Sequence, residues 1–324
     1  MISRRNAFRA TFRATVCAAT ALMTLGAAHT AQAQGNEAWP TRTVKLVVPY
    51  AAGGYADTRA RLIADSLGKV LGQPVIIDNR GGAGGVTGTD VISKATDGHT
   101  FGFGSPGPLV TNPMLMKKMP YDAKTAFKPI VLIEQAPLFL TTAPNQSFKN
   151  VQELIAYAKA KPGDVTFGSS GVGGAHHLSG ELLAYQTKTD MTHVPYKGGS
   201  LAATDLMGGH LAMMFEMGYS ALPSIKAKKI NALAVSSKTR LAVLPDVPTL
   251  DEAGVKGFES YNWLGMVAPA NTPDAVVAKL NQAVNEALKS DKSLRQMIES
   301  SGGQIMGGTP QAYGKYLEAE RAKW

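Results

Sequence analysis

Cysteine is almost absent from this chain: Cys17 is the only one among 324 residues, and it lies in the N-terminal segment. Beyond that segment, the lack of thiols excludes disulfides, thiolate catalysis and metal sites with cysteine ligands. A lipid-anchored cysteine also fits badly, because Ala14-Thr15-Val16 makes a poor lipobox and little apolar sequence precedes it.

Long apolar runs are absent as well, since no stretch reaches the roughly 18 residues that a membrane-spanning helix needs. Residues 1–33 have instead the three parts of an export signal. An uncharged stretch and the cleavage pattern Ala31-Gln32-Ala33 follow a positive region that contains Arg4, Arg5, Arg9 and Arg13. We expect export to the periplasm with cleavage near Ala33. Ser3-Arg4-Arg5 leaves the Sec and twin-arginine routes both open.

The excess of positive charge is small once this signal is removed. Residues 1–33 hold four of the 33 lysines and arginines and none of the 24 acids, so 29 basic and 24 acidic residues remain. The basic residues form no cluster of the kind that follows a phosphate backbone, so nucleic acid is not an expected partner. A mildly positive surface still favours anionic ligands.

Strand and helix patterns alternate along the mature chain. Residues 43–49, 73–78 and 100–105 read as strands, and a helix after the first has a buried stripe through Ile63 and Leu67. Asp57 is a candidate cap for that helix. This βαβαβ order predicts a parallel sheet with helices on its faces.

The same alternation begins again after residue 150. Two extended apolar pieces, 129–133 and 138–142, precede it, and Asn150 and Thr309 are expected to start helices. We divide the chain into a signal peptide (1–33), the first part of lobe I (34–135), lobe II (136–231) and a return to lobe I with C-terminal helices (232–324). In such sheets, ligands bind beyond the carboxyl ends of the strands, which predicts a cleft between the lobes.

Glycine-rich loops lie where strands end and helices begin, at Gly53-Gly54, at 81–85 and at 169–174. Glycine lets the backbone approach a ligand and point N–H groups at it. A helix N-terminus adds partial positive charge, so a carboxylate can be held without a lysine. Such turns also occur for steric reasons alone, and both interpretations stay open on this pattern.

Segments across the mature chain match a known pattern in the same order. Val48-Pro49-Tyr50-Ala51-Ala52-Gly53-Gly54-Tyr55-Ala56-Asp57 resembles the signature VPF-x-x-GG-x-x-D. Further matches lie at 71–80, 82–85, 112–113, 120–122, 167–171, 177–178, 194–198, 244–249, 263–265 and 269–273. Together they closely resemble the receptors of tripartite tricarboxylate transporters, also called Bug proteins.

The resemblance implies an α/β type II periplasmic binding protein, with two α/β lobes and a ligand cleft between them, rather than an enzyme. It implies a small organic acid as ligand, with one carboxylate held by backbone groups and waters between the Gly53-Gly54 and Ser169–Gly171 loops. It also implies membrane transporter subunits as partners, and we expect a monomer without cofactor or metal. The expected ligand-binding residues are Tyr50, Ala52, Gly53, Gly54, Tyr55, Asp57, Ser105, Ser169, Ser170, Gly171, His177, Tyr196 and Glu216.

Two positions depart from the family's pattern. Tyr55 stands where members often have a small residue or proline, and its ring could stack on an aromatic ligand or fill space. Glu216 stands where members often have aspartate, and its carboxylate would repel a second ligand carboxylate and accept from a hydroxyl or amine. These departures favour a ligand whose second end is aromatic, hydroxylated or amino-bearing.

Rival functions find less support. Neither Ser105 nor Ser170 lies in G-x-S-x-G, and the histidines show no metal-binding spacing. His177, near a helix N-terminus, is a candidate hydrogen-bond donor to the cleft. A periplasmic accessory protein that presents its ligand to a sensor kinase would share the fold and the pocket, so this alternative stays open.

Overall fold

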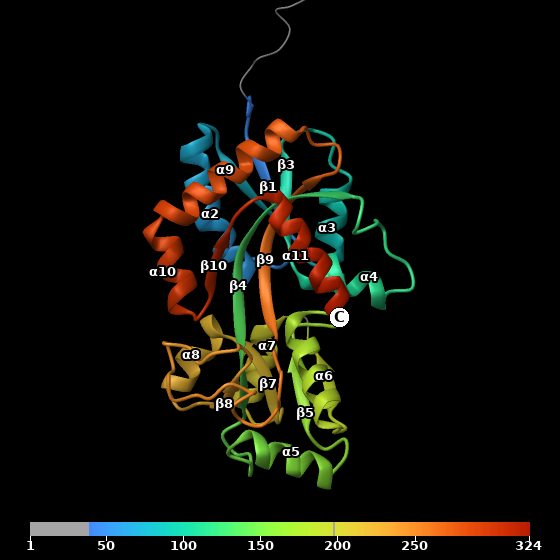
Figure 1. Cartoon of the computed structure of the whole chain (residues 1–324), viewed down its shortest axis with the longest axis vertical. Coiled ribbons are helices and arrows are strands. Elements are labelled where there is room, and N and C mark those ends of the chain that lie inside the picture. The colour runs from blue at the N-terminus through green and yellow to red at the C-terminus, as the bar shows by residue number, and fades with distance from the viewer. Residues whose placement is uncertain (1–38, 197) are drawn as a thin grey trace, which may run out of the picture. The chain divides into compact units, whose positions relative to one another are not determined.

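A computed structural model describes residues 39–196 and 198–324, and residues 42–324 form one compact unit (Figure 1). The expected signal peptide and its cleavage site near Ala33 lie outside the described residues. No helix in the described part is both long enough and apolar enough to cross a membrane.

Lobe I is built on the predicted βαβαβ unit. Its strands β1, β2 and β3 are parallel in the order β2-β1-β3, and β9 adds to β3 in the antiparallel direction. The strands are β1 (Val44–Val48), β2 (Val75–Asn79), β3 (Thr100–Gly104), β9 (Tyr261–Pro269) and β10 (Gln304–Gly307). The helices are α2 (Tyr55–Leu71), α3 (Val86–Ser93), α4 (Asn112–Leu115), α9 (Asp274–Ser290), α10 (Lys292–Ser300) and α11 (Pro310–Lys323).

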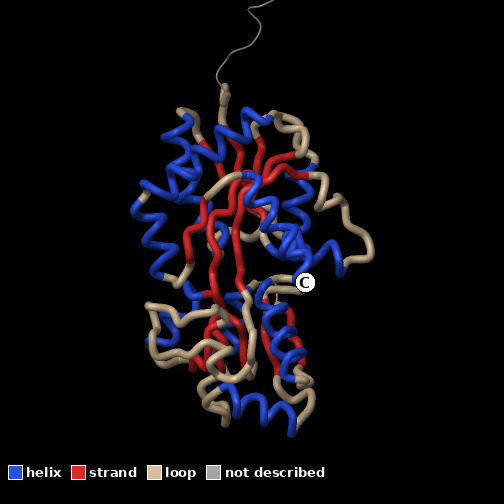
Figure 2. Tube along the Cα trace, viewed as in Figure 1, coloured by secondary structure: helices blue, strands red, loops and turns tan. Residues whose placement is uncertain are grey.

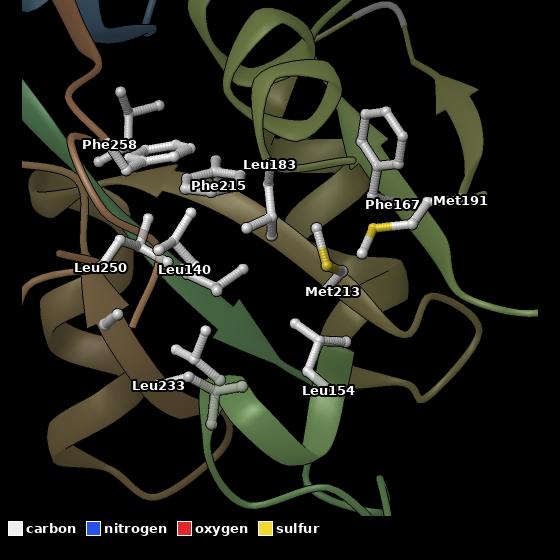
Figure 3. Packing of buried hydrophobic residues seen from close by; sticks show 14 of the residues in the cluster. Leu140, Leu154, Phe167, Leu183, Met191, Met213, Phe215, Leu233, Leu250 and Phe258 are labelled. Carbon is white, nitrogen blue, oxygen red and sulfur yellow. The ribbon is translucent and has the colours of Figure 1, made fainter. Parts of the chain in front are cut away.

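Lobe II has a second sheet with its own core. Phe167, Leu183 and Phe215 are fully buried there between the sheet and its helices (Figure 3). The strands are β5 (Thr166–Ser169), β6 (Thr192–Pro195), β7 (Met213–Met217) and β8 (Asn231–Val235). The helices are α5 (Val151–Ala160), α6 (Ala175–Thr187), α7 (Gly199–Met207) and α8 (Gly218–Lys226). Figure 2 shows strands in the middle of each lobe and helices around them.

One long strand, β4 (Phe127–Thr142), belongs to both sheets. Its first part pairs with β9 and β10, and its last five residues pair with β7. The two extended apolar pieces, 129–133 and 138–142, are therefore parts of one continuous strand. Glu134 lies between the two pieces, and Arg59 Nε lies 3.2 Å from its carboxylate, so this ion pair neutralises the charge that the strand carries through the interior.

The chain returns to lobe I later than residue 232. β8 pairs with the second half of β4, and Leu250, Val255 and Phe258 pack into the core of lobe II. The strand that leads back is β9, which begins at Tyr261. Residues 232–260 therefore lie with lobe II, because their apolar side chains are needed to complete its core.

Two of the predicted helix starts are confirmed, and a third is shifted. Asn150 and Thr309 each accept a backbone N–H from the first turn of the following helix, as predicted. Helix α2 begins at Tyr55 with Gly54 as its N-cap, so Asp57 is not the capping residue. Asp57 instead reaches back from the first turn to the N–H of Gly53.

Candidate ligand-binding site

The first glycine loop, residues 50–54, is held by a buried carboxylate. Asp57 accepts from the N–H of Gly53 at 2.8 Å, from Arg61 at 2.9 Å and from the Asn79 amide at 3.1 Å. Burial opposes the charge on Asp57, but these hydrogen bonds outweigh burial and hold its pKa below the ordinary value. The exposed residues Ala52 and Gly53 therefore sit on an anchored turn.

Beside this loop, the Tyr50 hydroxyl and the Ser105 hydroxyl share a hydrogen bond of 2.5 Å. Tyr50 follows β1 and Ser105 follows β3, so two adjacent strands place them together. Burial raises the pKa of Tyr50, and the bond to Ser105 partly offsets the effect. A Cβ on Gly85 would lie 3.1 Å from the Tyr50 hydroxyl, so the 81–85 loop packs closely here.

In lobe II, three histidines hold the loop of residues 169–174. The pairs are His193 Nε2 with Ser169 Oγ at 2.7 Å, His176 Nδ1 with Ser170 Oγ at 2.7 Å, and His177 Nδ1 with the N–H of Gly173 at 3.2 Å. Tyr196 also contacts this loop, because its N–H donates to the Ser169 carbonyl. Its hydroxyl donates to Asp205 at 2.6 Å. Gly171 has φ +126°, which strains any larger residue.

The loops of the two lobes touch each other. The Thr111 hydroxyl, at the end of a π-helical turn (Gly107–Thr111) in lobe I, donates to the Gly173 carbonyl at 2.5 Å. The Asn112 amide donates to the Gly84 carbonyl at 3.4 Å, and a Cβ on Gly173 would clash with Asn112 Oδ1. Glycine at position 173 thus permits the close approach of the Asn112 side chain from lobe I. Glycine at position 84 permits that of the Val172 carbonyl from lobe II, which lies 3.2 Å from the place of a Cβ.

Tyr55 is already engaged by protein groups. Its ring stacks on Tyr219 of α8 with 5.7 Å between centroids, and the Arg59 guanidinium lies 4.8 Å from the ring centre. Burial, with the Glu134 carboxylate as the next cause, raises the pKa of Tyr55 well above its ordinary value. This arrangement favours the interpretation that Tyr55 fills space between the lobes over stacking on an aromatic ligand.

Glu216 lies near the carboxyl end of β7 and is 1% exposed. The Thr141 hydroxyl donates to its carboxylate at 3.1 Å. Burial raises the pKa of Glu216 to about 7, although the hydrogen bonds from Thr141 and Ser220 act in the opposite direction. At neutral pH the group is therefore divided between a carboxylate and a carboxylic acid, which can also donate.

His177 differs most from its expected role. Its Nδ1 accepts from Gly173, and its Nε2 lies 3.4 Å from Glu181 Oε1. Both nitrogens are occupied inside lobe II, which favours a role in ordering the 169–174 loop over donation to a ligand. The histidines do not combine with other residues into a metal site, as the described residues contain no group of three or more potential ligands.

Four neighbours of the site are missed by reasoning from the sequence: Thr111, Asn112, His193 and Tyr219. Asn112 lies in one of the segments that match the family, but no local pattern shows what it contacts. From the sequence alone, His193 is considered only as a metal ligand, and its spacing from the other histidines does not support that role. The partners of these residues are distant in the sequence, so periodicity and capping signals could not reveal them.

A family model described as the tripartite tricarboxylate transporter family receptor matches residues 59–324. The chain belongs to this family. Protein BugT of Bordetella pertussis is 35% identical to this receptor over 290 residues, which cover 89% of each chain.

Solved structures agree with this assignment. Rpa4515 of R. palustris, determined with adipate, has a TM-score of 0.83 and 37% identity and covers 88% of this chain and 96% of its own. MatC from Rhodopseudomonas palustris, with bound malate, has a TM-score of 0.82 and 33% identity and covers 88% of this chain and 98% of its own. The expected fold class is confirmed, and the receptor is a periplasmic solute-binding protein rather than an enzyme.

Proposed function

We propose that this receptor captures a small organic acid in the periplasm and delivers it to the membrane subunits of a tripartite transporter. The observation that carries the proposal is the close approach of glycine-rich loops from opposite lobes. A Cβ on Gly84 would lie 3.2 Å from the Val172 carbonyl, and the Thr111 hydroxyl donates to the Gly173 carbonyl beside it. These loops lie next to the starts of helices α3 and α6, whose N-caps, Gly85 and Gly174, make no side-chain capping bond, and the partial positive charge of a helix N-terminus favours an anion.

In this proposal one carboxylate binds to backbone N–H groups of the Gly53-Gly54 loop and the Ser169–Gly171 loop. The adipate and malate in the two relatives are both dicarboxylates, which supports a ligand of this class. Glu216 would face the far end of the ligand. Since its pKa is raised to about 7, its protonated form can donate to a second carboxylate, and its ionised form can accept from a hydroxyl or amine.

Thermal unfolding of the mature receptor with adipate, malate or benzoate tests the capture step. An acid present at a hundred times its dissociation constant should stabilise the protein by about 2.7 kcal/mol, seen as a rise in Tm. Adipamide, which has the shape of adipate without its charge, serves as the matched control and should give a much smaller shift. No rise in Tm with any carboxylate would contradict acid capture.

Uptake by cells tests delivery to the transporter. Deletion of the gene for this receptor should abolish uptake of whichever acid stabilises the purified protein. Undiminished uptake of that acid by the deletion strain would argue against delivery, even if the purified receptor binds it.

A further inference from the structure

The backbone of Gly173 links a histidine of lobe II to lobe I. Its N–H donates to His177 Nδ1 at 3.2 Å, and its carbonyl accepts from the Thr111 hydroxyl at 2.5 Å. Gly173 is buried, and Asn112 Oδ1 occupies the place where a Cβ would lie, so there is no room for a larger residue. A change in the hydrogen bond between His177 and Gly173 therefore also affects the hydrogen bond between Gly173 and Thr111 of lobe I.

The contact with Gly173 requires a neutral His177. Because a backbone N–H points at Nδ1, the ring proton must be on Nε2, which faces Glu181 Oε1 at 3.4 Å. If Nδ1 were also protonated, its N–H would point at the N–H of Gly173. Two donors would then face each other, and the hydrogen bond would be lost. Besides Glu181 on its own helix, the groups that face the ring are His193 of β6, with 4.0 Å between centroids, and the uncharged Phe167 of β5.

We propose that His177 is a positioning residue whose neutral ring holds Gly173 against Thr111, so that acidification loosens the contact between the lobes and weakens ligand capture. The part of this inference that concerns affinity rests on the proposed function. The part that concerns the loop does not, because both hydrogen bonds lie within the protein.

The electrostatic environment supports this direction. Burial lowers the pKa of His177, and Glu181 opposes the effect. Burial, followed by the neighbouring His177, lowers the pKa of His193 to about 4. A ring released to water returns to the ordinary value of about 6.5, so the opened loop binds more protons than the ordered one as the pH falls below 6.5. Proton uptake therefore favours opening.

Amide hydrogen exchange of residues 169–174 in the ligand-free receptor tests the loop directly. After correction for the intrinsic effect of pH, we expect protection in the wild type to be lower at pH 5 than at pH 7. His177→Asn should lose less protection than the wild type between pH 7 and pH 5, because the Asn carbonyl can accept from Gly173 and does not titrate, and only His176 and His193 of this loop then still do. His177→Ala should lose protection already at pH 7. Equal protection of the wild type at both pH values would overturn the proposal.

Affinity supplies the second test, with adipate and malate as the probes. Wild-type affinity should fall relative to His177→Asn by on the order of tenfold between pH 7 and pH 5. Glu216 is common to both proteins, so its own titration cancels in the comparison. His210→Asn alters an exposed histidine away from the loop and should follow the wild type. The same pH profile for wild type and His177→Asn would contradict the role in capture.

The two tests separate the two proposals. If neither probe binds at any pH, the proposed function fails for these acids, and amide exchange still decides whether His177 holds the loop. If the probes bind and exchange shows no dependence on pH, the proposed function stands and the inference about His177 fails.

Discussion

At the scale of single residues, Asp57 determines the shape of the first glycine loop. Its carboxylate is buried and receives hydrogen bonds from Gly53, Arg61 and Asn79. A neutral side chain at this position would not both accept from these groups and neutralise the arginine. The same residue thus supports both the start of α2 and the loop to which we assign carboxylate binding.

Replacing Asp57 with Ala should lower the free energy of unfolding by about 1–3 kcal/mol, because buried donors lose their acceptor. It should also weaken binding of the acid found in the thermal screen. Asp65→Ala is the matched control on the same helix, since Asp65 pairs with Lys69 and its side chain is 68% exposed. That change should cost less than about 1 kcal/mol. Urea unfolding measures both, and equal losses would argue against the anchoring role.

At the scale of elements, the pairing of β4 with β9 joins the C-terminal part of the chain to the sheet of lobe I. They pair with each other from Phe127 to Pro137, and α11 packs against β4. Tyr313 of α11 is 1% exposed and lies directly over Gly265 of β9. The glycine is needed at that point because the ring occupies the place of a side chain.

Gly265→Ala should therefore destabilise the receptor by about 1–3 kcal/mol or more, as its Cβ would clash with the Tyr313 ring. Gly314→Ala is the matched control on α11. A Cβ there has only an ordinary contact at 3.8 Å with Pro129, and alanine favours the helix by up to about 1 kcal/mol. Unfolding in urea should thus shift in opposite directions for the two variants. A neutral Gly265→Ala would show that α11 can move away from β9.

At the scale of the whole molecule, buried titratable groups make stability depend on pH. Glu216 releases its proton at about pH 7 in the folded state and at its ordinary value of 4.5 when unfolded. Between these values the folded state binds more protons, so the stabilisation present below pH 4.5 is lost as the pH rises through 7. His176 and His193, whose pKa burial lowers to about 4, act in the opposite sense and cost stability as the pH falls below 6.5.

Glu216→Gln should remove the first of these effects. At pH 8 the variant should be more stable than the wild type by up to about 3 kcal/mol, since it avoids a buried charge, and at pH 4.5 the two should differ little. Urea unfolding at both pH values measures this, and Glu286→Gln, an exposed position on α9, should change stability little at either. A gain of the same size at pH 4.5 and pH 8 would show that packing, not charge, is responsible.

Local structure and family membership could be predicted from the amino-acid sequence alone. Strand and helix periodicity placed the βαβαβ unit, and Asn150 and Thr309 mark helix starts because a capping side chain bonds to N–H groups only three residues away. The ordered family segments predicted the two-lobed binding fold. These features can be recognised in the sequence because each depends on residues that are neighbours in the chain or on a short motif.

Which residues meet between the lobes depends on tertiary packing. Arg59 and Glu134 are 75 residues apart, and their ion pair neutralises a carboxylate in the middle of β4. Thr111 and Gly173 are 62 residues apart, and Tyr55 meets Tyr219 from the opposite lobe. Such contacts follow from how the two sheets pack, and side-chain periodicity in a single segment carries no information about the distant partner that packing selects.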